Sequence, residues 1–397
     1  MAAENNNKTL NVPTLRFPEF SGEWERMRAS ELLGFFSTNS LSWEQLEYGG
    51  QDKLNLHYGL IHNGLPTLIN AAKEELPAVK PEFSPKKYTL CKEGDVAFAD
   101  ASEDTNDVGK VVEFINCDGK DIVCGLHTIH GRDKEDKTVM GFKGYVFSSP
   151  AFHNQIRRIA QGTKIYSINT SNFDEVDVCL PSKAEQHKIV VLLSKLDERI
   201  AIQNKIIEKY KSLIKAIAKR LFIEDYPVIR LGDIADIYQP KTISSDHLSS
   251  DADKGCYPVY GANGIIGYYS KYNHEKPQIC IACRGSSCGA INYTKPRSWI
   301  TGNAMVINTE RFADRINQRF LYHYLSIKDF TSIISGSGQP QIVRTPVQAF
   351  PIPLPTPLVQ TRIASILDGL KDDVTLDIQQ LKLYSKQKLY FLTHLFI

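Results

Sequence analysis

Residues 180–223 form a long stretch with apolar residues at heptad spacing, and this pattern constrains the fold more than any other segment. The stretch contains neither Gly nor Pro after Pro181, and residues with high helix propensity fill the remaining positions. About 38 helical residues span roughly 57 Å, so we expect a long helix whose apolar seam needs a partner helix. The seam positions, spaced by four and three, are Ile189, Leu193, Leu196, Ile200, Gln203, Ile207, Tyr210, Ile214, Ile217 and Leu221.

The partner is predicted in the same chain, because residues 354–397 repeat this stretch at an offset of 174 without a gap. Both segments begin with Leu-Pro and end with Leu-Phe-Ile. Two amphipathic helices can resemble each other by chance, but ten identities over forty-four positions favour an internal repeat. The identical residues of the first segment are Leu180, Pro181, Gln186, Ile189, Leu193, Leu196, Tyr210, Leu221, Phe222 and Ile223.

The repeat extends beyond the helices into the segments that precede them. Residues 24–33 match residues 226–235 at an offset of 202, so that Arg28 corresponds to Arg230. Before each helix, Gly162 corresponds to Gly336 and Ile168 to Ile342 at the offset of 174. Because 202 − 174 = 28, the first globular half holds 28 more residues than the second. The whole chain therefore reads as globule, helix, globule, helix.

The interiors of both halves contain short strand-like runs separated by Gly, Asn, Asp, Ser and Pro, as in residues 88–115 and 258–309. We predict an α+β fold in which two mixed, mostly β globules are separated by two long antiparallel helices forming a coiled coil. Similar halves joined in this way are related by a pseudo-two-fold axis. The expected segments are a disordered tail at 1–11, globules at 12–179 and 224–353, and helices at 180–223 and 354–397.

Composition sets broad limits on the class of protein. The chain has 397 residues, is 42% hydrophobic and carries a formal net charge of +2, which neither indicates nor excludes nucleic-acid binding. No run of eighteen apolar residues and no signal peptide is expected, so the sequence predicts a cytoplasmic protein. A reduced compartment also suits its scattered cysteines, Cys91, Cys117, Cys124, Cys179, Cys256, Cys280, Cys283 and Cys288.

The repeated architecture, the phrases FADASEDTNDVGK and YPVYGANGIIGYY, and the Gly loop before each Leu-Pro helix start resemble a known family. They are similar to the specificity subunit of type I restriction-modification systems, over about residues 12–397. The resemblance implies two target recognition domains, each reading one half of a split, asymmetric DNA sequence. It also implies that the helices set the length of the unread spacer between the two half-sites and bind adenine methyltransferase subunits. Two methyltransferase subunits are expected, and restriction subunits join the same complex.

The seam contains two polar residues near the helix midpoints, Gln203 and its repeat counterpart Asp377. In an antiparallel pair of equal helices the midpoints meet, so a Gln–Asp contact would select register and orientation. The alternative is that both residues lie at a solvated edge of the pair.

The expected DNA contacts are Lys, Arg, Asn, Gln, Ser, Thr, His and Tyr side chains in Gly-rich loops, from which phosphates and base edges are within reach. An Asn-Gly pair is more often a hairpin turn, a loop Arg is usually solvated, and a loop His often satisfies buried groups. The candidates are Tyr58, His62, Asn63, Ser102, Lys110, His127, Thr128, His130, Arg132 and Lys164 in the first half, and Asn263, Gly264, Arg284, Ser286, Ser287, Gln339, Gln341 and Arg344 in the second.

Sequence motifs for catalysis are missing: the chain has no phosphate-binding loop, dinucleotide fingerprint, HExxH or methyltransferase tetrapeptide. Cys280, Cys283 and Cys288 lie in an apolar run and do not supply four zinc ligands, so no metal is expected. We therefore expect a non-catalytic chain without a cofactor of its own. The resemblance implies that S-adenosylmethionine and ATP with Mg²⁺ bind to partner subunits. The competing hypotheses are a coiled-coil scaffold without specific DNA reading and a nuclease, although no acidic and Lys cluster of the D…ExK type stands out in either globule.

Overall fold

Two compact units make up the protein. The computed structural model describes residues 10–50, 53–84, 87–222, 226–250, 256–336 and 338–397. Unit 1 comprises residues 1–203 and 380–397, and unit 2 comprises residues 204–379. Each unit therefore contains one globular segment together with part of both long helices.

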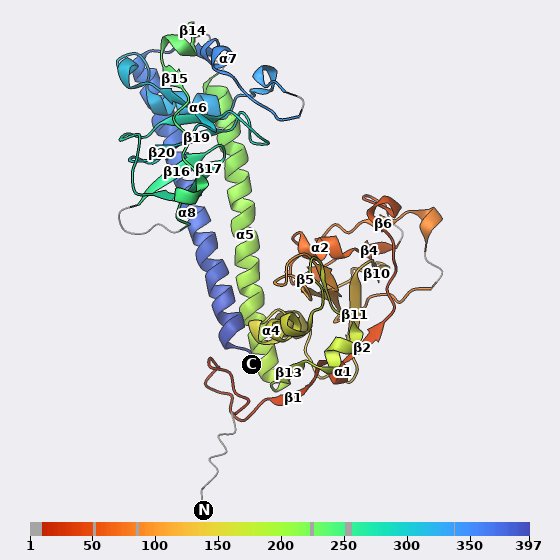
Figure 1. The fold of residues 1–397 in the computed structure, drawn as a ribbon. Helices are drawn as coiled ribbons and strands as arrows, with labels where there is room; N and C mark the ends of the chain where they lie inside the picture. Colours follow the sequence, from red (N-terminus) through yellow and green to blue (C-terminus); the bar gives the residue numbers. More distant parts are fainter. Residues whose placement is uncertain (1–9, 51–52, 85–86, 223–225, 251–255, 337) are drawn as a thin grey trace, which may run out of the picture. The chain divides into compact units, whose positions relative to one another are not determined.

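The two long helices are α5 (Lys183–Leu221) and α8 (Pro357–His394). In each unit a segment of α5 lies beside a segment of α8 (Figure 1). In unit 1 the first turns of α5 share a core with the last turns of α8, and in unit 2 the end of α5 shares a core with the start of α8. The segments therefore pair in an antiparallel sense in both units. None of the ten predicted seam residues of α5 is exposed, as their heptad spacing predicts.

Unit 1 is built around a four-stranded sheet, β10-β4-β6-β3, and a five-stranded sheet, β2-β11-β7-β9-β5. Two smaller pairs, β1-β13 and β12-β8, complete its strands. The strands are β1 (Glu25–Arg28), β2 (Leu33–Phe36), β3 (Leu46–Glu47), β4 (Leu54–Leu56), β5 (Leu68–Asn70), β6 (Ala78–Val79), β7 (Val96–Ala99), β8 (Ala101–Ser102), β9 (Val111–Asn116), β10 (Ile122–Cys124), β11 (Thr128–Asp133), β12 (Tyr166–Ser167) and β13 (Asp177–Leu180). The short helices are α1 (Ala29–Leu32), α2 (Tyr58–His62), α3 (Phe142–Phe147) and α4 (Pro150–Ile159).

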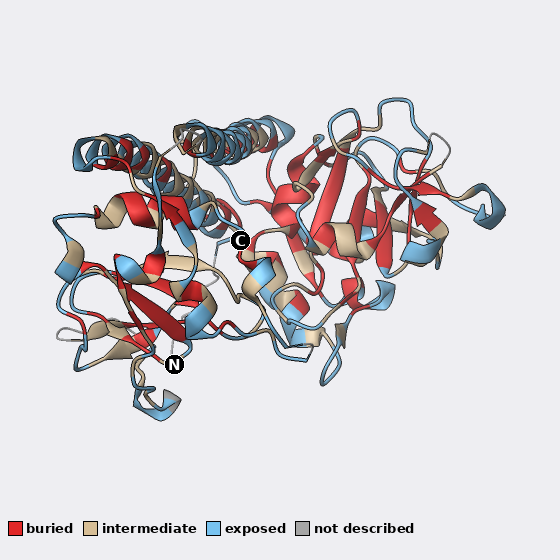
Figure 2. Cartoon of the chain, turned by 90° about the horizontal axis from the view of Figure 1, so that it is seen from above, coloured by how far each residue is buried: buried red, intermediate tan, exposed pale blue. Residues whose placement is uncertain are grey.

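The main core of unit 1 joins the five-stranded sheet to the long helices. Phe98 of β7 packs against Phe147 and Phe173 with ring centroids 5.2 and 4.9 Å apart. The same cluster includes Leu193 of α5 and Phe396, both buried. Burying aromatic rings contributes strongly to stability, so this core fixes the globule on the helix ends. Figure 2 shows the strands of the unit as largely buried.

Unit 2 has a four-stranded sheet, β15-β21-β18-β19, a three-stranded sheet, β17-β16-β20, and the pair β14-β22. Its strands are β14 (Val228–Arg230), β15 (Asp236–Tyr238), β16 (Tyr257–Gly261), β17 (Gly264–Tyr269), β18 (Ile279–Ala282), β19 (Ile291–Tyr293), β20 (Trp299–Ile300), β21 (Ala304–Asn308) and β22 (Pro351–Pro353). Its short helices are α6 (Gln318–Ser326) and α7 (Arg344–Gln348).

The central strand of unit 2 is β18, which is buried on both faces. Ile279, Ile281 and Cys283 pack into the core that reaches the long helices, whereas Cys280 packs into a second cluster. Successive residues of a strand point to opposite faces, which explains this division. Because Cys280 and Cys283 belong to different clusters, they do not converge on a common ligand.

The repeat is visible in the backbone contacts at the base of each unit. Arg28 pairs with Asp177 in the β1-β13 ladder, and the equivalent residues Arg230 and Pro351 pair in the β14-β22 ladder. One residue further on, Ala29 N donates to Val176 O at 2.9 Å, as does Leu231 N to Phe350 O at 2.9 Å. The offsets of 202 and 174 therefore relate equivalent positions in space as well as in sequence.

The predicted α+β class, with two globular halves and long helices, is confirmed. Both helices begin three residues later than expected, at Lys183 and Pro357, because Leu180 ends β13 and Ser182 caps the first turn of α5. The predicted tail at 1–11 lies outside the described residues up to residue 9. Asn11 joins the fold, since its carbonyl accepts a hydrogen bond from Trp24 N at 2.8 Å. None of the helices among the described residues is long and apolar enough to span a membrane.

Candidate nucleic-acid interface

Two loops of unit 2 pair side by side and bring together two of the predicted clusters. Arg284 follows β18 and forms an isolated antiparallel bridge with Gln341. Gly285 N donates to Pro340 O at 3.1 Å, and Ile342 N donates to Cys283 O at 3.0 Å. These main-chain bonds hold the loop 283–289 against the loop 335–342. We call this feature the paired-loop surface of unit 2.

The paired-loop surface of unit 2 presents polar side chains to solvent. Arg284, Ser286, Gln339 and Gln341 are exposed, and Arg344 is exposed at the first turn of α7. Ser287 is half-buried, and its carbonyl accepts a hydrogen bond from Ala290 N at 2.9 Å. Arg and Gln side chains on a rigid backbone suit hydrogen bonding to base edges and phosphates. The buried strand β18 supplies the rigid support on one side.

Unit 1 contains the same paired loops at the equivalent positions. Gln161 and Ser167 exchange hydrogen bonds of 3.0 and 2.8 Å, as Ser335 and Gln341 do at 2.8 Å each, and these residues are related by the offset of 174. Strand β12 of this loop pairs with β8, so that Tyr166 lies opposite Ser102. Lys164 is exposed at the tip of the loop. The paired-loop surface of unit 1 therefore carries Ser102 and Lys164 where unit 2 carries Arg and Gln side chains.

A second group of unit 1 candidates gathers around Tyr58 at the start of α2. The Tyr58 ring contacts His62 and His127 edge-on, with centroids 5.8 and 5.2 Å apart. His62 Nε2 bonds Ala101 O at 3.0 Å, and Lys110 Nζ donates to His62 O at 3.1 Å. Tyr58, His62, Lys110, His127 and Ser102, chosen separately from sequence, therefore lie around β7 and β8. Asn63 is exposed at the end of α2.

His127 is held in an unusual backbone conformation. Its φ of 54° lies in the left-handed region, which a residue with a side chain rarely adopts. Asp100 stabilises it twice, since Asp100 N donates to His127 O at 3.0 Å and the carboxylate bonds His127 Nδ1 at 3.0 Å. Burial raises the pKa of Asp100 even though His127 opposes the shift. A strained, exposed side chain with a fixed orientation is typical of a binding surface.

Trp43 extends this group and was missed by the sequence analysis. Its ring lies 4.4 Å from that of His57, at an interplanar angle of 35°, and 43% of the residue is exposed. Burial, with a smaller contribution from His127, lowers the pKa of His57 and so favours the neutral imidazole. Exposed aromatic rings can stack on unpaired bases or contact sugars. Sequence alone does not distinguish an exposed Trp from a core Trp such as Trp24.

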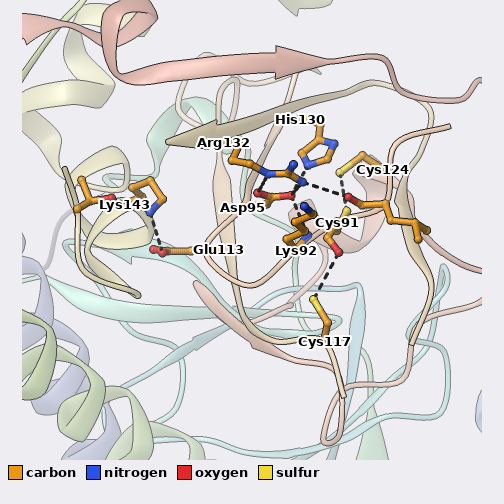
Figure 3. Close-up of polar contacts among 11 residues, drawn as sticks. Cys91, Lys92, Asp95, Glu113, Cys117, Cys124, His130, Arg132 and Lys143 are labelled. Carbon is orange, nitrogen blue, oxygen red and sulfur yellow. Dashed lines mark hydrogen bonds and ion pairs between the residues drawn. The ribbon is translucent and has the colours of Figure 1, made fainter. Parts of the chain in front are cut away.

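Two predicted contacts must be withdrawn, because His130 and Thr128 are 0% and 4% exposed. Thr128 Oγ1 donates to Gly125 O at 2.6 Å, and His130 Nε2 bonds Asp95 at 2.7 Å. Arg132 is half-buried and clamps the same carboxylate with two hydrogen bonds of 2.6 and 2.7 Å (Figure 3). Thr128 and His130 of β11 therefore form hydrogen bonds in the interior of unit 1. This agrees with the alternative interpretation of loop histidines, in which they satisfy buried polar groups.

The third predicted cluster of unit 2 is the tip of the β16-β17 hairpin. Asn263 is exposed, and Gly264 has a φ of 96°, which explains the glycine at this turn. Ala262 O accepts a hydrogen bond from Asn292 of β19 at 3.3 Å, which ties the tip to the four-stranded sheet. Ile265 and Ile266 follow the turn and are 41% and 51% exposed. Two adjacent exposed isoleucines were not predicted, because period-two alternation would bury one of them.

A groove beside α4 adds basic side chains to unit 1. It encloses about 510 Å³, and Lys110, Arg157, His153 and Asn106 line it. Burial lowers the pKa of His153, despite a hydrogen bond with the Asn106 backbone that raises it. Lys110 belongs both to this groove and to the group around Tyr58. The groove therefore places two basic side chains and the carboxylate of Asp107 next to that group.

The fold contains two repeated α+β units on paired long helices, and each unit has a paired-loop surface. This arrangement defines the class of internally duplicated proteins with one candidate binding surface in each unit. The family model described as the type I restriction modification DNA specificity domain matches residues 86–211 and 223–384. The chain belongs to this family.

Relatives identified by sequence agree with this family. The chain is 35% identical over 119 residues to a type I restriction enzyme specificity subunit from Haemophilus influenzae, covering 29% of this chain and 30% of the relative. It is 27% identical over 139 residues to the EcoprrI specificity subunit from Escherichia coli, covering 35% and 34%. The chain therefore spans about a third of the length of these relatives.

The fold resembles the crystal structure of a type I restriction-modification S subunit from M. genitalium, with a TM-score of 0.59 and 18% identity over 97% of this chain and 99% of that one. A chain from a study of complex assembly in the type I R-M system gives a TM-score of 0.55 at 15% identity, covering 93% and 96%.

Proposed function

We propose that this chain is the DNA-reading subunit of a type I restriction-modification complex, and that each unit reads one half of an asymmetric, bipartite target. The observation that carries the proposal is the paired-loop surface, which recurs with the same main-chain bonds and with different side chains. Equivalent backbone with different side chains suits two readers of different sequence.

In this proposal affinity comes from exposed cations, among them Lys164, Arg284 and Arg344, and sequence selectivity from side chains such as Gln339 and Gln341. The target adenine would be flipped and methylated by a methyltransferase subunit. This chain therefore needs no catalytic residue, and S-adenosylmethionine and ATP with Mg²⁺ would bind to partner subunits. Restriction subunits would join the same complex.

The long helices would set the spacer between half-sites and bind the methyltransferase subunits. Exposed apolar residues support the second role: Leu383 and Tyr390 of α8, both in unit 1, are 58% and 53% exposed. They are seven residues apart and so share one face of the helix. Exposed apolar stripes of this kind are typical of protein-binding surfaces.

The polar face of α5 with Lys195, Glu198, Arg199, Lys205 and Lys209 is the less favoured docking surface. The proposed register contact between Gln203 and Asp377, both half-buried, stays a prediction.

The test exchanges residues 12–179 for the corresponding segment of a relative, in a complex reconstituted with the methyltransferase subunits. Mapping methylated adenines should show one changed half-site, with the other half-site and the spacer unchanged. An insertion of about four residues in the helices should change the spacer alone. The scaffold hypothesis predicts no defined target in any variant, and changes in both half-sites would contradict modular reading.

A further inference from the structure

Three buried side chains of unit 1 form a group with the composition of a metal site. Cys91, Cys124 and His130 each offer one ligand atom, and these atoms all lie within 4.8 Å of one another. The two sulfur atoms are 3.5 Å apart, and the three residues are 5%, 2% and 0% exposed. Figure 3 shows their side chains gathered together, with Asp95 and Arg132 on the other side of the His130 ring.

The histidine in this group is already oriented as a ligand would be. His130 Nε2 bonds the Asp95 carboxylate at 2.7 Å, which leaves the lone pair on Nδ1. Nδ1 is buried and has no hydrogen-bond partner among the residues that the structure describes. A carboxylate that fixes the second nitrogen of a ligating histidine is the common outer-shell arrangement at zinc sites. An unpartnered buried nitrogen costs free energy in a metal-free interior.

We propose that unit 1 binds one thiophilic divalent cation of the zinc class through Cys91 Sγ, Cys124 Sγ and His130 Nδ1. In a tetrahedral zinc site, bond lengths of about 2.3 Å to sulfur and about 2.0 Å to nitrogen place sulfurs about 3.8 Å apart and a nitrogen about 3.5 Å from each sulfur. The observed sulfur spacing is close to this value, and a ring nitrogen of His130 lies within 4.8 Å of both sulfur atoms, so that it must approach by about 1.3 Å at most.

The charges also balance in this interior. The cation displaces the thiol protons of Cys91 and Cys124 to solvent, and two thiolates neutralise its double charge. Asp95 is paired separately with Arg132 through hydrogen bonds of 2.6 and 2.7 Å. Binding of the cation therefore adds no net charge to the buried region. It avoids the free-energy cost of burying an uncompensated charge.

The position of the group gives the cation a structural role. Cys124 ends β10 of the four-stranded sheet, and His130 lies in β11, an inner strand of the five-stranded sheet that pairs with β7 and β2. Only residues 125–127 separate β10 from β11, and His127 of the candidate surface lies among them. A shared cation would fix the two sheets to each other at the start of the loop that carries His127.

The test measures metal in the full-length chain, purified under reducing conditions from zinc-supplemented cells. We expect about one zinc per chain by mass spectrometry, and cobalt substitution should give a thiolate charge-transfer absorption band. Cys91→Ser, Cys124→Ser and His130→Gln should each weaken binding at least tenfold in competition with a chromogenic chelator. The matched control is Cys280→Ser, a buried cysteine of unit 2, which should retain one equivalent.

The cobalt spectrum of the unmodified protein keeps the proposal testable if the variants fail to fold. No metal and no charge-transfer band in the folded wild-type chain would overturn it. So would the loss of two titratable thiols without bound metal, because that result identifies a disulfide between Cys91 and Cys124. Equal binding by the Cys124→Ser variant would also exclude the site.

Discussion

Gln186 and Gln360 lie 174 residues apart and make the same three hydrogen bonds in the two units. In each case Nε2 donates to the Pro carbonyl of the Leu-Pro pair, Pro181 O at 2.9 Å and Pro355 O at 2.8 Å. Both side chains are buried, at 1% and 0% exposed. The other two bonds reach loop main chain: Lys137 O at 3.1 Å and Val139 N at 2.9 Å for Gln186, and Arg315 O at 3.0 Å and Asn317 N at 2.7 Å for Gln360.

The first prediction is that Gln186→Leu and Gln360→Leu each destabilise one unit. Each change leaves buried main-chain groups without partners, so we expect a loss of about 3 kcal/mol in the free energy of unfolding. Hydrogen exchange should localise the effect of Gln186→Leu to unit 1 and that of Gln360→Leu to unit 2. The control is Gln380→Leu at an exposed position of α8. Equal protection in all three variants would refute the role of this amide.

The second prediction concerns base reading by unit 2. Arg284→Ala should reduce methylation of the cognate target about tenfold or more and relax selectivity in one half-site, because a specific base contact contributes about 1–3 kcal/mol. Methylation of a library of half-site variants measures both effects. Arg311→Ala is the control, since Arg311 is exposed in unit 2 and paired with Asp236 at 3.5 Å. Unchanged selectivity for Arg284→Ala would remove this residue from the proposed contacts.

The sequence predicts the fold of this chain well because the repeat is encoded locally. Ile189 and Leu193 belong to a series of apolar residues three and four positions apart, and the offset of 174 identifies the equivalent residues of the second helix. The helices therefore follow from patterns within short stretches of sequence. The candidate surface depends on contacts between distant segments. No local pattern indicates that Arg284 pairs with Gln341, although both were chosen from their loops. His130 shows the opposite case, because a polar residue in a Gly-rich stretch turned out to be buried by its pairing with Asp95.

The third prediction is that Lys164 contacts phosphate. Lys164→Gln should weaken DNA binding similarly for all sequences and reduce the salt dependence, d log K/d log[salt], by about one. Binding isotherms at several salt concentrations test this result. Lys183→Gln serves as the control, because Lys183 of unit 1 is paired with Asp136 at 2.8 Å. A sequence-dependent loss with an unchanged salt slope would instead indicate base contact.

The fourth prediction is a pH dependence of stability in unit 2. Burial lowers the pKa of His323 from 6.5 to about 4, and the hydrogen bond that Asp368 forms with it does not reverse this shift. As the pH falls from 6.5 to about 4, the unfolded chain binds a proton that the folded unit does not bind. The unfolding free energy should therefore decrease over this window, by about 3 kcal/mol at most for this group.

The matched variants for this pH effect are His323→Gln and His247→Gln. In the His323→Gln variant the introduced amide can still donate to Asp368 but does not titrate, so part of the decrease between pH 6.5 and about 4 should disappear. His247 is exposed in the same unit, and its replacement should leave the pH profile unchanged. Urea unfolding at a series of pH values measures both. Identical slopes for wild type and His323→Gln would show that other groups, such as Asp368, determine the acid sensitivity.

The last prediction addresses the apolar stripe of α8. Leu383→Glu should abolish binding of the methyltransferase subunit without affecting folding, because Leu383 is 58% exposed and a buried unpaired carboxylate at an interface is costly. Ser385→Glu adds the same charge about 160° around the helix, at another exposed position, and should bind normally. Co-purification and sedimentation measure complex formation, and circular dichroism measures folding. If Leu383→Glu assembles like the wild type, docking must occur elsewhere, and the polar face of α5 becomes the next surface to test.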